Sequence, residues 1–393
     1  MPTKLAASGL TTKTERGIYT YIAVFSAVLN TVLLIAPVIA GKLVERYGVT
    51  PLELGGLFSL ELAAFSLASL PAFLWLRRIN LRTATYLFTA LVIVGNIISG
   101  FMDSFPALMA ARFITSLASG SIMVILLTLS GRAANPSRSF GIFVVAQLAM
   151  GALILAVFPA IYAGVGVAAM YWTLACLAAL CLFAVRCIDG EALRSQPRET
   201  PGDGASTKPV GPKAPVYRFV LGLAAVLLFY IALSGVWTFI AQISAAAGIG
   251  LSASSLVLSL ATVAGIASAL VATILGDSPR RRVFLLGGYL GMGLSVALLF
   301  GAPGLVRFAI AAVIFKFAWT FILPYLLSTL AGLGNAHVMS VVNLMIGTGF
   351  AIGPLLSGAL IESTGDFTAM LSVALGGLLI SMAAITLIQR KAV

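Results

Sequence analysis

The chain has 393 residues, of which 60% are hydrophobic and only 9% carry a charge. Soluble globular proteins carry about 25% charged residues, so this composition excludes that class. A net charge of +12 would suggest nucleic-acid binding in a soluble protein. Here the basic residues cluster in short segments between apolar runs, which is typical of membrane proteins, and we expect no nucleic-acid partner.

Twelve apolar runs are long enough to cross a bilayer, because a spanning helix needs about 20 mostly apolar residues. The first half of the chain contains six of them, at 18–40, 54–76, 83–102, 106–130, 139–163 and 168–187. The second half contains the other six, at 217–243, 253–276, 283–301, 305–330, 337–361 and 367–388.

A hydrophilic segment from Asp189 to Pro215 separates the two sets of runs. It is rich in proline and charge and nearly free of large apolar side chains, which predicts a flexible linker. The predicted organisation is a cytoplasmic tail (1–17), a six-helix bundle (18–187), a cytoplasmic linker (188–216), a second six-helix bundle (217–388) and a cytoplasmic tail (389–393).

The distribution of Lys and Arg predicts the orientation. With the N-terminus inside, cytoplasmic segments hold 19 of the 24 basic residues. Both termini and the linker are therefore predicted to be cytoplasmic. The polar, basic N-terminal segment is interpreted as a cytoplasmic lead-in and not as a cleaved signal peptide. The three cysteines show neither a disulfide framework nor a metal motif.

The two halves show features of an internal repeat. Several identical residues recur 200 positions apart, each set running from an outer turn through a helix into a basic turn: Gly48 and Gly248, Ser59 and Ser259, Leu60 and Leu260, Arg82 and Arg282. Six plus six helices in parallel repeat is the architecture of a large class of transporters.

Four motifs resemble those of the major facilitator superfamily. The turn from Gly276 to Arg282 is similar to its Gly-Asp…Gly-Arg-Arg motif, and the turn after the second span is a weaker copy with Leu76 at the acidic position. Arg112 with Ser116 is similar to an Arg-x-x-x-Gly motif. The conformational motif residues are Arg77, Arg78, Arg82, Asp277, Arg280, Arg281, Arg282 and, in the eleventh span, Gly349, Gly353 and Pro354.

The resemblance covers nearly the whole chain. It implies an all-α membrane protein of 12 transmembrane helices, with two six-helix bundles related by pseudo-two-fold symmetry. It also implies a monomeric secondary transporter that alternates between inward-open and outward-open states. The fifth span departs from the pattern of proton-coupled drug exporters, because Pro159 follows Phe158 and not a glycine. This departure weakens a drug-antiporter interpretation.

Three charged residues lie well inside predicted spans: Glu61, Arg112 and Lys316. Charges in such positions are expensive and tend to mark function. The helical rise places Glu61 about 10 Å and Arg112 about 9 Å below the outer ends of their helices, so they can pair. The pair is either a structural ion pair that fixes the two helices or a proton-sensitive site.

Lys316 lies about 16 Å into its helix, near the bilayer midplane, where snorkelling is difficult. We expect it to face the substrate. Two cations against one acid favour an anionic solute. Weaker candidates for solute contact, for which helix packing is an equal alternative, are Asn30, Gln147, Tyr230, Trp237, Trp319 and Asn343.

The sequence lacks nucleotide-binding and hydrolase motifs, so we expect no enzyme activity, no cofactor and no metal. The favoured function is proton-coupled transport of a small organic anion across a bilayer, in a bacterial inner membrane. A proton-driven efflux antiporter for drugs or metabolites is the alternative, and a passive channel or scramblase is a third possibility. Concentrative uptake distinguishes the first from the last.

Overall fold

A computed structural model describes residues 12–29, 31–76, 78–133, 136–162, 164–188, 216–275, 280–331 and 336–390. These residues are almost entirely α-helical, with no strand among them. The predicted linker from 189 to 215 and three candidate residues, Asn30, Arg77 and Asp277, lie outside the described residues.

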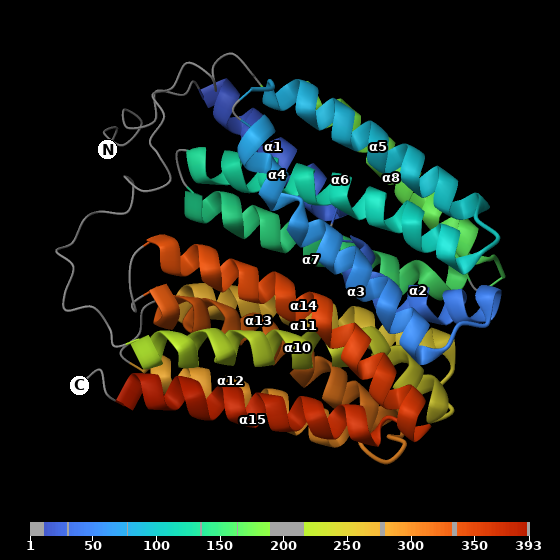
Figure 1. The fold of residues 1–393 in the computed structure, drawn as a ribbon, viewed down its shortest axis with the longest axis vertical. Coiled ribbons are helices and arrows are strands. Elements are labelled where there is room, and N and C mark those ends of the chain that lie inside the picture. The colour runs from blue at the N-terminus through green and yellow to red at the C-terminus, as the bar shows by residue number, and fades with distance from the viewer. Residues whose placement is uncertain are drawn as a thin grey trace. The chain divides into compact units, whose positions relative to one another are not determined.

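The described residues of the first half of the chain form eight helices (Figure 1). They are α1 (Thr12–Leu29), α2 (Thr31–Tyr47), α3 (Pro51–Leu67), α4 (Ser69–Trp75), α5 (Leu81–Phe101), α6 (Phe105–Arg132), α7 (Pro136–Tyr162) and α8 (Val167–Val185). The second half contains α10 (Val216–Ala246), α11 (Leu251–Leu275), α12 (Arg281–Leu298), α13 (Leu305–Ala331), α14 (Ala336–Thr364) and α15 (Thr368–Arg390).

Eleven segments of the described chain are long and apolar enough to cross a membrane. The first runs from Thr14 to Tyr47 through α1 and α2, and the second runs from Pro51 to Ala72 through α3 and α4. The predicted ninth span corresponds to α12, which is helical but has a mean hydropathy below that of the eleven segments. Arg281 and Arg282 at its start and its glycines lower the average over its 18 residues.

Local signals in the sequence explain where several helices begin. Thr50 and Glu53 form a capping box at the start of α3, in which each side chain accepts a hydrogen bond from the other residue's backbone N–H at 3.2 and 2.9 Å. The Asn80 side chain accepts from the N–H of Arg82 at 3.0 Å and caps α5. These caps fix the starts of the helices that carry Glu61 and Asn96.

The packing of the helices divides the chain into two compact units. The first comprises residues 1–35, 45–47 and 60–198, and the second comprises 36–44, 48–59 and 199–393. Parts of α2 and α3 therefore belong with the second half of the chain. The predicted division into bundles at 18–187 and 217–388 stays a prediction.

The same pattern of helix packing occurs in both halves of the chain. In the first half, α1 packs against α7 and α8, and α5 packs against α6 and α8. In the second half, α10 packs against α14 and α15, and α12 packs against α13 and α15 (Figure 1). The equivalent turns each hold a glycine in the left-handed region, with φ of 63° at Gly48 and 78° at Gly248. The 200-residue offset thus reflects a structural repeat.

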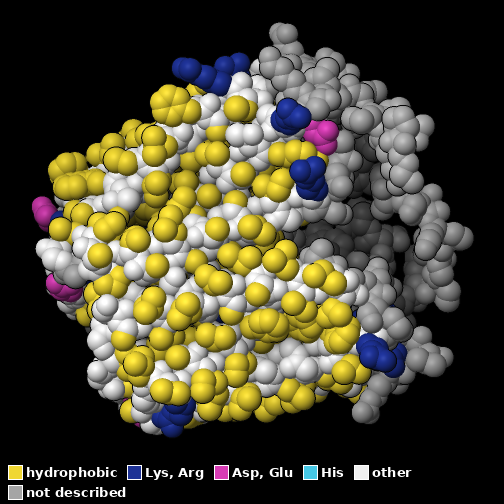
Figure 2. Space-filling view, turned by 180° about the vertical axis from the view of Figure 1, so that it is seen from behind, with side chains coloured by type: hydrophobic (Ala, Val, Ile, Leu, Met, Phe, Trp, Pro, Cys, Tyr) yellow, Lys and Arg dark blue, Asp and Glu magenta, His cyan; other side chains and the backbone are white. Residues whose placement is uncertain are grey.

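Hydrophobic side chains dominate the visible face in Figure 2, and the charged side chains lie near its margins. Large apolar residues such as Leu74, Phe183 and Ile274 are exposed on the surface. A soluble protein rarely exposes so much apolar area, whereas lipid tails accommodate it. The surface therefore fits a protein surrounded by a bilayer.

Candidate substrate and coupling site

Lys316 lies on α13 and is completely buried. Its Nζ lies 3.6 Å from the ring centroid of Trp319, one turn further along the same helix, and 4.0 Å from the ring centroid of Trp237 on α10. Both tryptophans are buried. The amine is therefore held between two indole faces, an arrangement in which cation–π attraction to its protonated form is strong because water is excluded.

The two tryptophans belong to a larger aromatic cluster. The ring of Phe315 lies nearly parallel to that of Trp237, with a centroid distance of 6.3 Å and an interplanar angle of 9°. Trp319 meets Trp237 edge-on at 5.8 Å and Phe315 edge-on at 6.4 Å. Such geometries are favourable between aromatic rings and hold the side chains in place. We call Trp237, Phe315 and Trp319 the aromatic box.

A glycine on α11 makes room for the lysine. A Cβ added at Gly265 would lie 3.1 Å from Cγ of Lys316, tighter than ordinary packing allows. The hydroxyl of Thr320 donates to the Gly265 carbonyl at 3.0 Å, and the hydroxyl of Ser268 donates to the Phe317 carbonyl at 2.7 Å. These bonds hold α11 close against α13, so the stem of Lys316 packs against backbone.

The Lys316 amine has no hydrogen-bond acceptor among the described residues. The helices that pack on α13 are α10, α11, α12 and α14. Their only acidic residue is Glu362 near the end of α14, and its carboxylate accepts a hydrogen bond from the N–H of Leu52 at 3.0 Å. Within the described chain, the protonated form of Lys316 would therefore be buried without a counter-anion.

Glu61 and Arg112 form an ion pair, as their matching depths predicted. Arg112 Nε donates to Glu61 Oε1, and both side chains are buried. Arg112 Nη1 donates to Asn96 Oδ1 at 2.8 Å, and the guanidinium lies 4.9 Å from the ring centroid of Tyr171. The Asn96 amide in turn donates to the Val92 carbonyl at 2.8 Å. The arginine is thus engaged from α3, α5 and α8.

Close packing between α5 and α6 brings Asn96 to Arg112. A Cβ at Gly95 would overlap the hydroxyl of Thr115, so glycine is required for this approach. Neither Asn96 nor Tyr171 was among the candidates from the sequence. A polar side chain in the middle of an otherwise apolar run was the available signal for Asn96.

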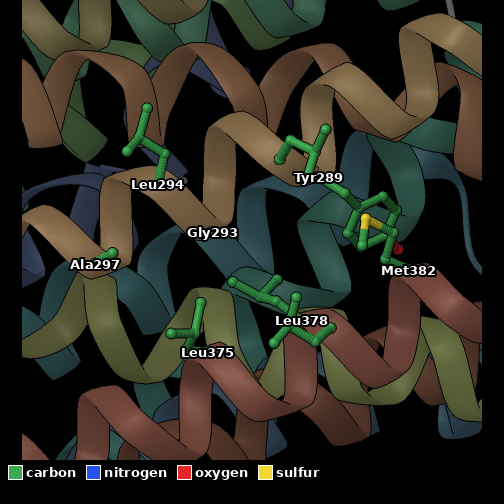
Figure 3. A pocket seen from close by; sticks show the side chains of 9 residues that line it. Tyr289, Gly293, Leu294, Ala297, Leu375, Leu378 and Met382 are labelled. Atoms are coloured by element: carbon green, nitrogen blue, oxygen red, sulfur yellow. The ribbon is translucent and has the colours of Figure 1, made fainter.

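The described surface also has two apolar grooves away from these charged residues. One, of about 190 Å³, lies between α12 and α15 and is lined by Tyr289, Leu294, Leu378, Met382 and neighbours (Figure 3). The other, of about 420 Å³, lies between α5 and α8 around Trp172. Their linings offer almost no polar group to orient a solute, so neither is the candidate transport site.

Comparison with known proteins then decides the family. The family model of the Major Facilitator Superfamily matches residues 20–338, more than half of the chain. The chain belongs to the major facilitator superfamily. No curated protein shows significant similarity to it. Among solved structures, a variant of the nucleoside transporter NupG is similar in fold, with a TM-score of 0.72, 13% identity, and coverage of 96% of this chain and 99% of that one.

Membership in this superfamily makes the chain an integral, multi-pass membrane transporter of a small-molecule substrate. The predicted all-α transporter fold is confirmed, and transporter membership stands against an enzyme. The similarity to NupG, at 13% identity, concerns the fold alone.

The motif residues typical of the superfamily occupy varied environments. Four arginines, Arg78, Arg82, Arg280 and Arg281, are exposed, whereas Arg282 is half-buried and donates to the Gln389 carbonyl. Gly349 and Gly353 lie where α14 crosses α10. A Cβ at Gly349 would overlap the Tyr230 side chain, and one at Gly353 would overlap the Ser234 hydroxyl and the Ile231 carbonyl. Pro354 follows within α14. Their role in conformational change stays a prediction.

The weaker solute candidates do not all gather around Lys316. Trp237 and Trp319 contact it directly. Tyr230 is buried against Phe350, with a centroid distance of 4.8 Å. Gln147 is half-buried on α7, and Asn343 is exposed on α14. The periodicity of an apolar helix does not show which way an isolated polar side chain points, and this limited the sequence prediction.

Proposed function

We propose that this superfamily member carries a small organic anion across the membrane together with protons, by alternating access. The observation that supports the anion is the buried amine of Lys316, which has no acceptor among the described residues and no counter-anion there when it is protonated. The proposal extends to a monomer in a bacterial inner membrane, with both termini in the cytoplasm.

The balance of charges supports an anionic solute. Glu61 already neutralises Arg112, whereas a protonated Lys316 has no such partner among the described residues. Removing an ammonium group from water costs several kcal/mol. Each indole face offsets about 2 kcal/mol of that cost. An anion about 4 Å from the ammonium would stabilise it by a further ~4 kcal/mol at an effective dielectric constant of 20. Together with the two indole faces, this is enough to offset the cost of removing the ammonium from water.

The aromatic box supports an organic solute over a small inorganic ion. Trp237 and Trp319 flank the Lys316 amine and Phe315 stacks on Trp237, so an apolar or planar solute body beside the amine would meet aromatic rings. Solute sites commonly combine such apolar walls with a few polar groups that fix orientation. NupG is a nucleoside transporter, and an uncharged nucleoside could also use the rings, although it would not require the lysine charge.

The test is transport by the full chain in proteoliposomes that contain a pH-sensitive dye. Panels of organic anions, lipophilic cations and uncharged nucleosides are added under an imposed proton gradient. We expect anions to move with protons, Lys316→Met to abolish this movement, and Arg307→Gln on the same helix to retain it. Arg307 is a suitable control because it bonds only the Phe300 and Gly301 carbonyls in the described structure.

Other outcomes would replace the proposal. Exchange of lipophilic cations against protons would establish the efflux antiporter. Movement of solute that never exceeds equilibrium, whatever the proton gradient, would establish a passive pathway. If Lys316→Met transports nucleosides as fast as the unmodified protein does, the lysine has a structural role only.

A further inference from the structure

We infer that Lys316 is itself the proton carrier: its amine is uncharged in the empty site and takes up a proton from water when the anion binds. This inference rests on the proposed function, because it requires an anionic substrate. It differs from the expectation that Glu61 senses protons, and it assigns Glu61 and Arg112 to holding helices together.

The surroundings of Lys316 support an uncharged amine in the empty site. The side chain is completely buried, and Nζ has no hydrogen-bond acceptor among the described residues. The titratable or charged residues on α13 and on the helices packed against it are Tyr217, Arg218, Tyr230, Arg281, Arg282, Tyr289, Arg307, Tyr325, His337 and Glu362. The acid among them, Glu362, accepts from the Leu52 N–H.

The remaining groups cannot serve as a counter-anion. Arginine is always cationic, and a neutral tyrosine carries no charge. The nearest along α13, Arg307 and Tyr325, are each nine residues from Lys316, or about 13 Å along the helix axis. The Tyr289 hydroxyl shares a hydrogen bond with Ser381 at 2.7 Å. Among the groups that the structure describes, a protonated Lys316 therefore has only the two indole faces to stabilise it until an anion arrives.

The Glu61–Arg112 pair has the opposite character. Arg112 is bonded to Glu61 and to Asn96, and its guanidinium also lies against the Tyr171 ring. Each charge already has its partner, and the contacts to Arg112 of α6 come from three other helices, α3, α5 and α8. The two charges neutralise each other and leave no net charge for an incoming ion to compensate, so the pair suits a fixed contact between helices more than a switch.

The transport step then conserves charge. One proton passes from water to Nζ as one carboxylate, already ionised in solution, enters beside it. The occupied site gains no net charge. After the change to the other open state, the anion leaves, and the ammonium returns its proton to water on that side. Proton and anion are coupled because neither is stable in the buried site without the other.

The experiment measures two quantities on the purified full chain. Anion binding is followed by quenching of tryptophan fluorescence, since Trp237 and Trp319 border the site. Proton uptake on binding is followed with a pH dye in weak buffer. The probes are the organic carboxylates that transport selects. We expect about one proton per bound anion in the unmodified protein and in Glu61→Gln.

The deciding variant is Lys316→Arg, because a guanidinium stays protonated at every accessible pH. It should bind the anion without proton uptake. In the unmodified protein, the anion affinity should fall about tenfold per pH unit above the midpoint of the amine, because protonated Lys316 is the binding form. This pH series tests the inference even where Lys316→Arg does not fold.

Failure of the inference is distinguishable from failure of the proposed function. Anion binding with no proton uptake and no pH dependence in the unmodified protein overturns the inference and leaves an anion transporter. Proton uptake that is lost in Glu61→Gln and kept in Lys316→Arg also overturns it and returns the role to Glu61. Absence of any anion binding overturns both.

Discussion

The backbone N–H of Leu355 donates a hydrogen bond to the hydroxyl of Ser59 at 2.9 Å. Leu355 follows Pro354, which has no N–H and lies inside α14. A proline in a helix interior disturbs the local ladder of backbone bonds. The Ser59 side chain on α3 gives one N–H of the disturbed turn a partner from another helix. Both residues belong to the second compact unit.

Ser59→Ala should therefore destabilise the protein by about 1 kcal/mol, the usual net contribution of one hydrogen bond. The measurement is the midpoint of thermal unfolding in detergent. Ser372→Ala is a matched control, since the Ser372 hydroxyl bonds only to the Thr368 carbonyl of its own helix. Equal midpoints for the two variants would show that the bond to Leu355 contributes nothing.

Removal of one partner from the buried ion pair should cost more than removal of both. Arg112→Gln leaves the Glu61 carboxylate buried without its cation, which typically costs about 3–5 kcal/mol. The double variant Glu61→Gln with Arg112→Gln should recover much of that loss, because two neutral amides can bond to each other and to Asn96. Thermal unfolding of the two single variants and the double variant measures the coupling. Additive losses would contradict a direct interaction.

Gly265→Val should weaken anion binding strongly. Its side chain would crowd Cγ of Lys316, which lies 3.1 Å from the position of an added Cβ, and would push the amine out of the aromatic box. Gly287→Val on α12 is the control, because a Cβ there meets nothing within 4 Å. Anion affinity, measured by fluorescence quenching, is the readout. Unchanged affinity in Gly265→Val would mean that the position of the Lys316 stem does not matter.

Gly353→Ala should destabilise the crossing of α14 and α10. The added Cβ would overlap the Ser234 hydroxyl and approach the Ile231 carbonyl, and backbone atoms cannot move aside like a side chain. Overpacking of this kind costs about 1–3 kcal/mol. Gly376→Ala should have no such cost, because its Cβ would meet open space. The unfolding midpoints of the two variants should therefore differ, and a similar midpoint would show that the crossing adapts.

The sequence was sufficient to place the helices and the buried charges. Hydropathy located the spans, and the helical rise alone put Glu61 and Arg112 at one depth, where the structure pairs them. Only α12 fell short of a clear span, because Arg281, Arg282 and its glycines lie in an otherwise apolar helix.

Rotation of the helices about their axes was harder to predict, because apolar residues surround each helix. Trp319 lies beside Lys316 because residues three apart share a helix face. Trp237 approaches Lys316 from α10, and Asn96 and Tyr171 approach Arg112 from neighbouring helices. These approaches depend on close contacts between helices, which glycines such as Gly95 and Gly265 permit. Such contacts are tertiary and have no periodic signal in the sequence.

The contact between α3 and α14 is reciprocal. Gly55 of α3 lies against the Pro354 carbonyl of α14, and Gly358 of α14 lies against the Pro51 carbonyl of α3, each too close for a Cβ. Backbone meets backbone at both points, so no side chain there is inserted into a hole on the other helix. When this contact opens and closes, the glycine surfaces can therefore part without any rotamer change, and the side-chain bonds to be broken are those of Ser59 to Leu355 and of Glu362 to Leu52.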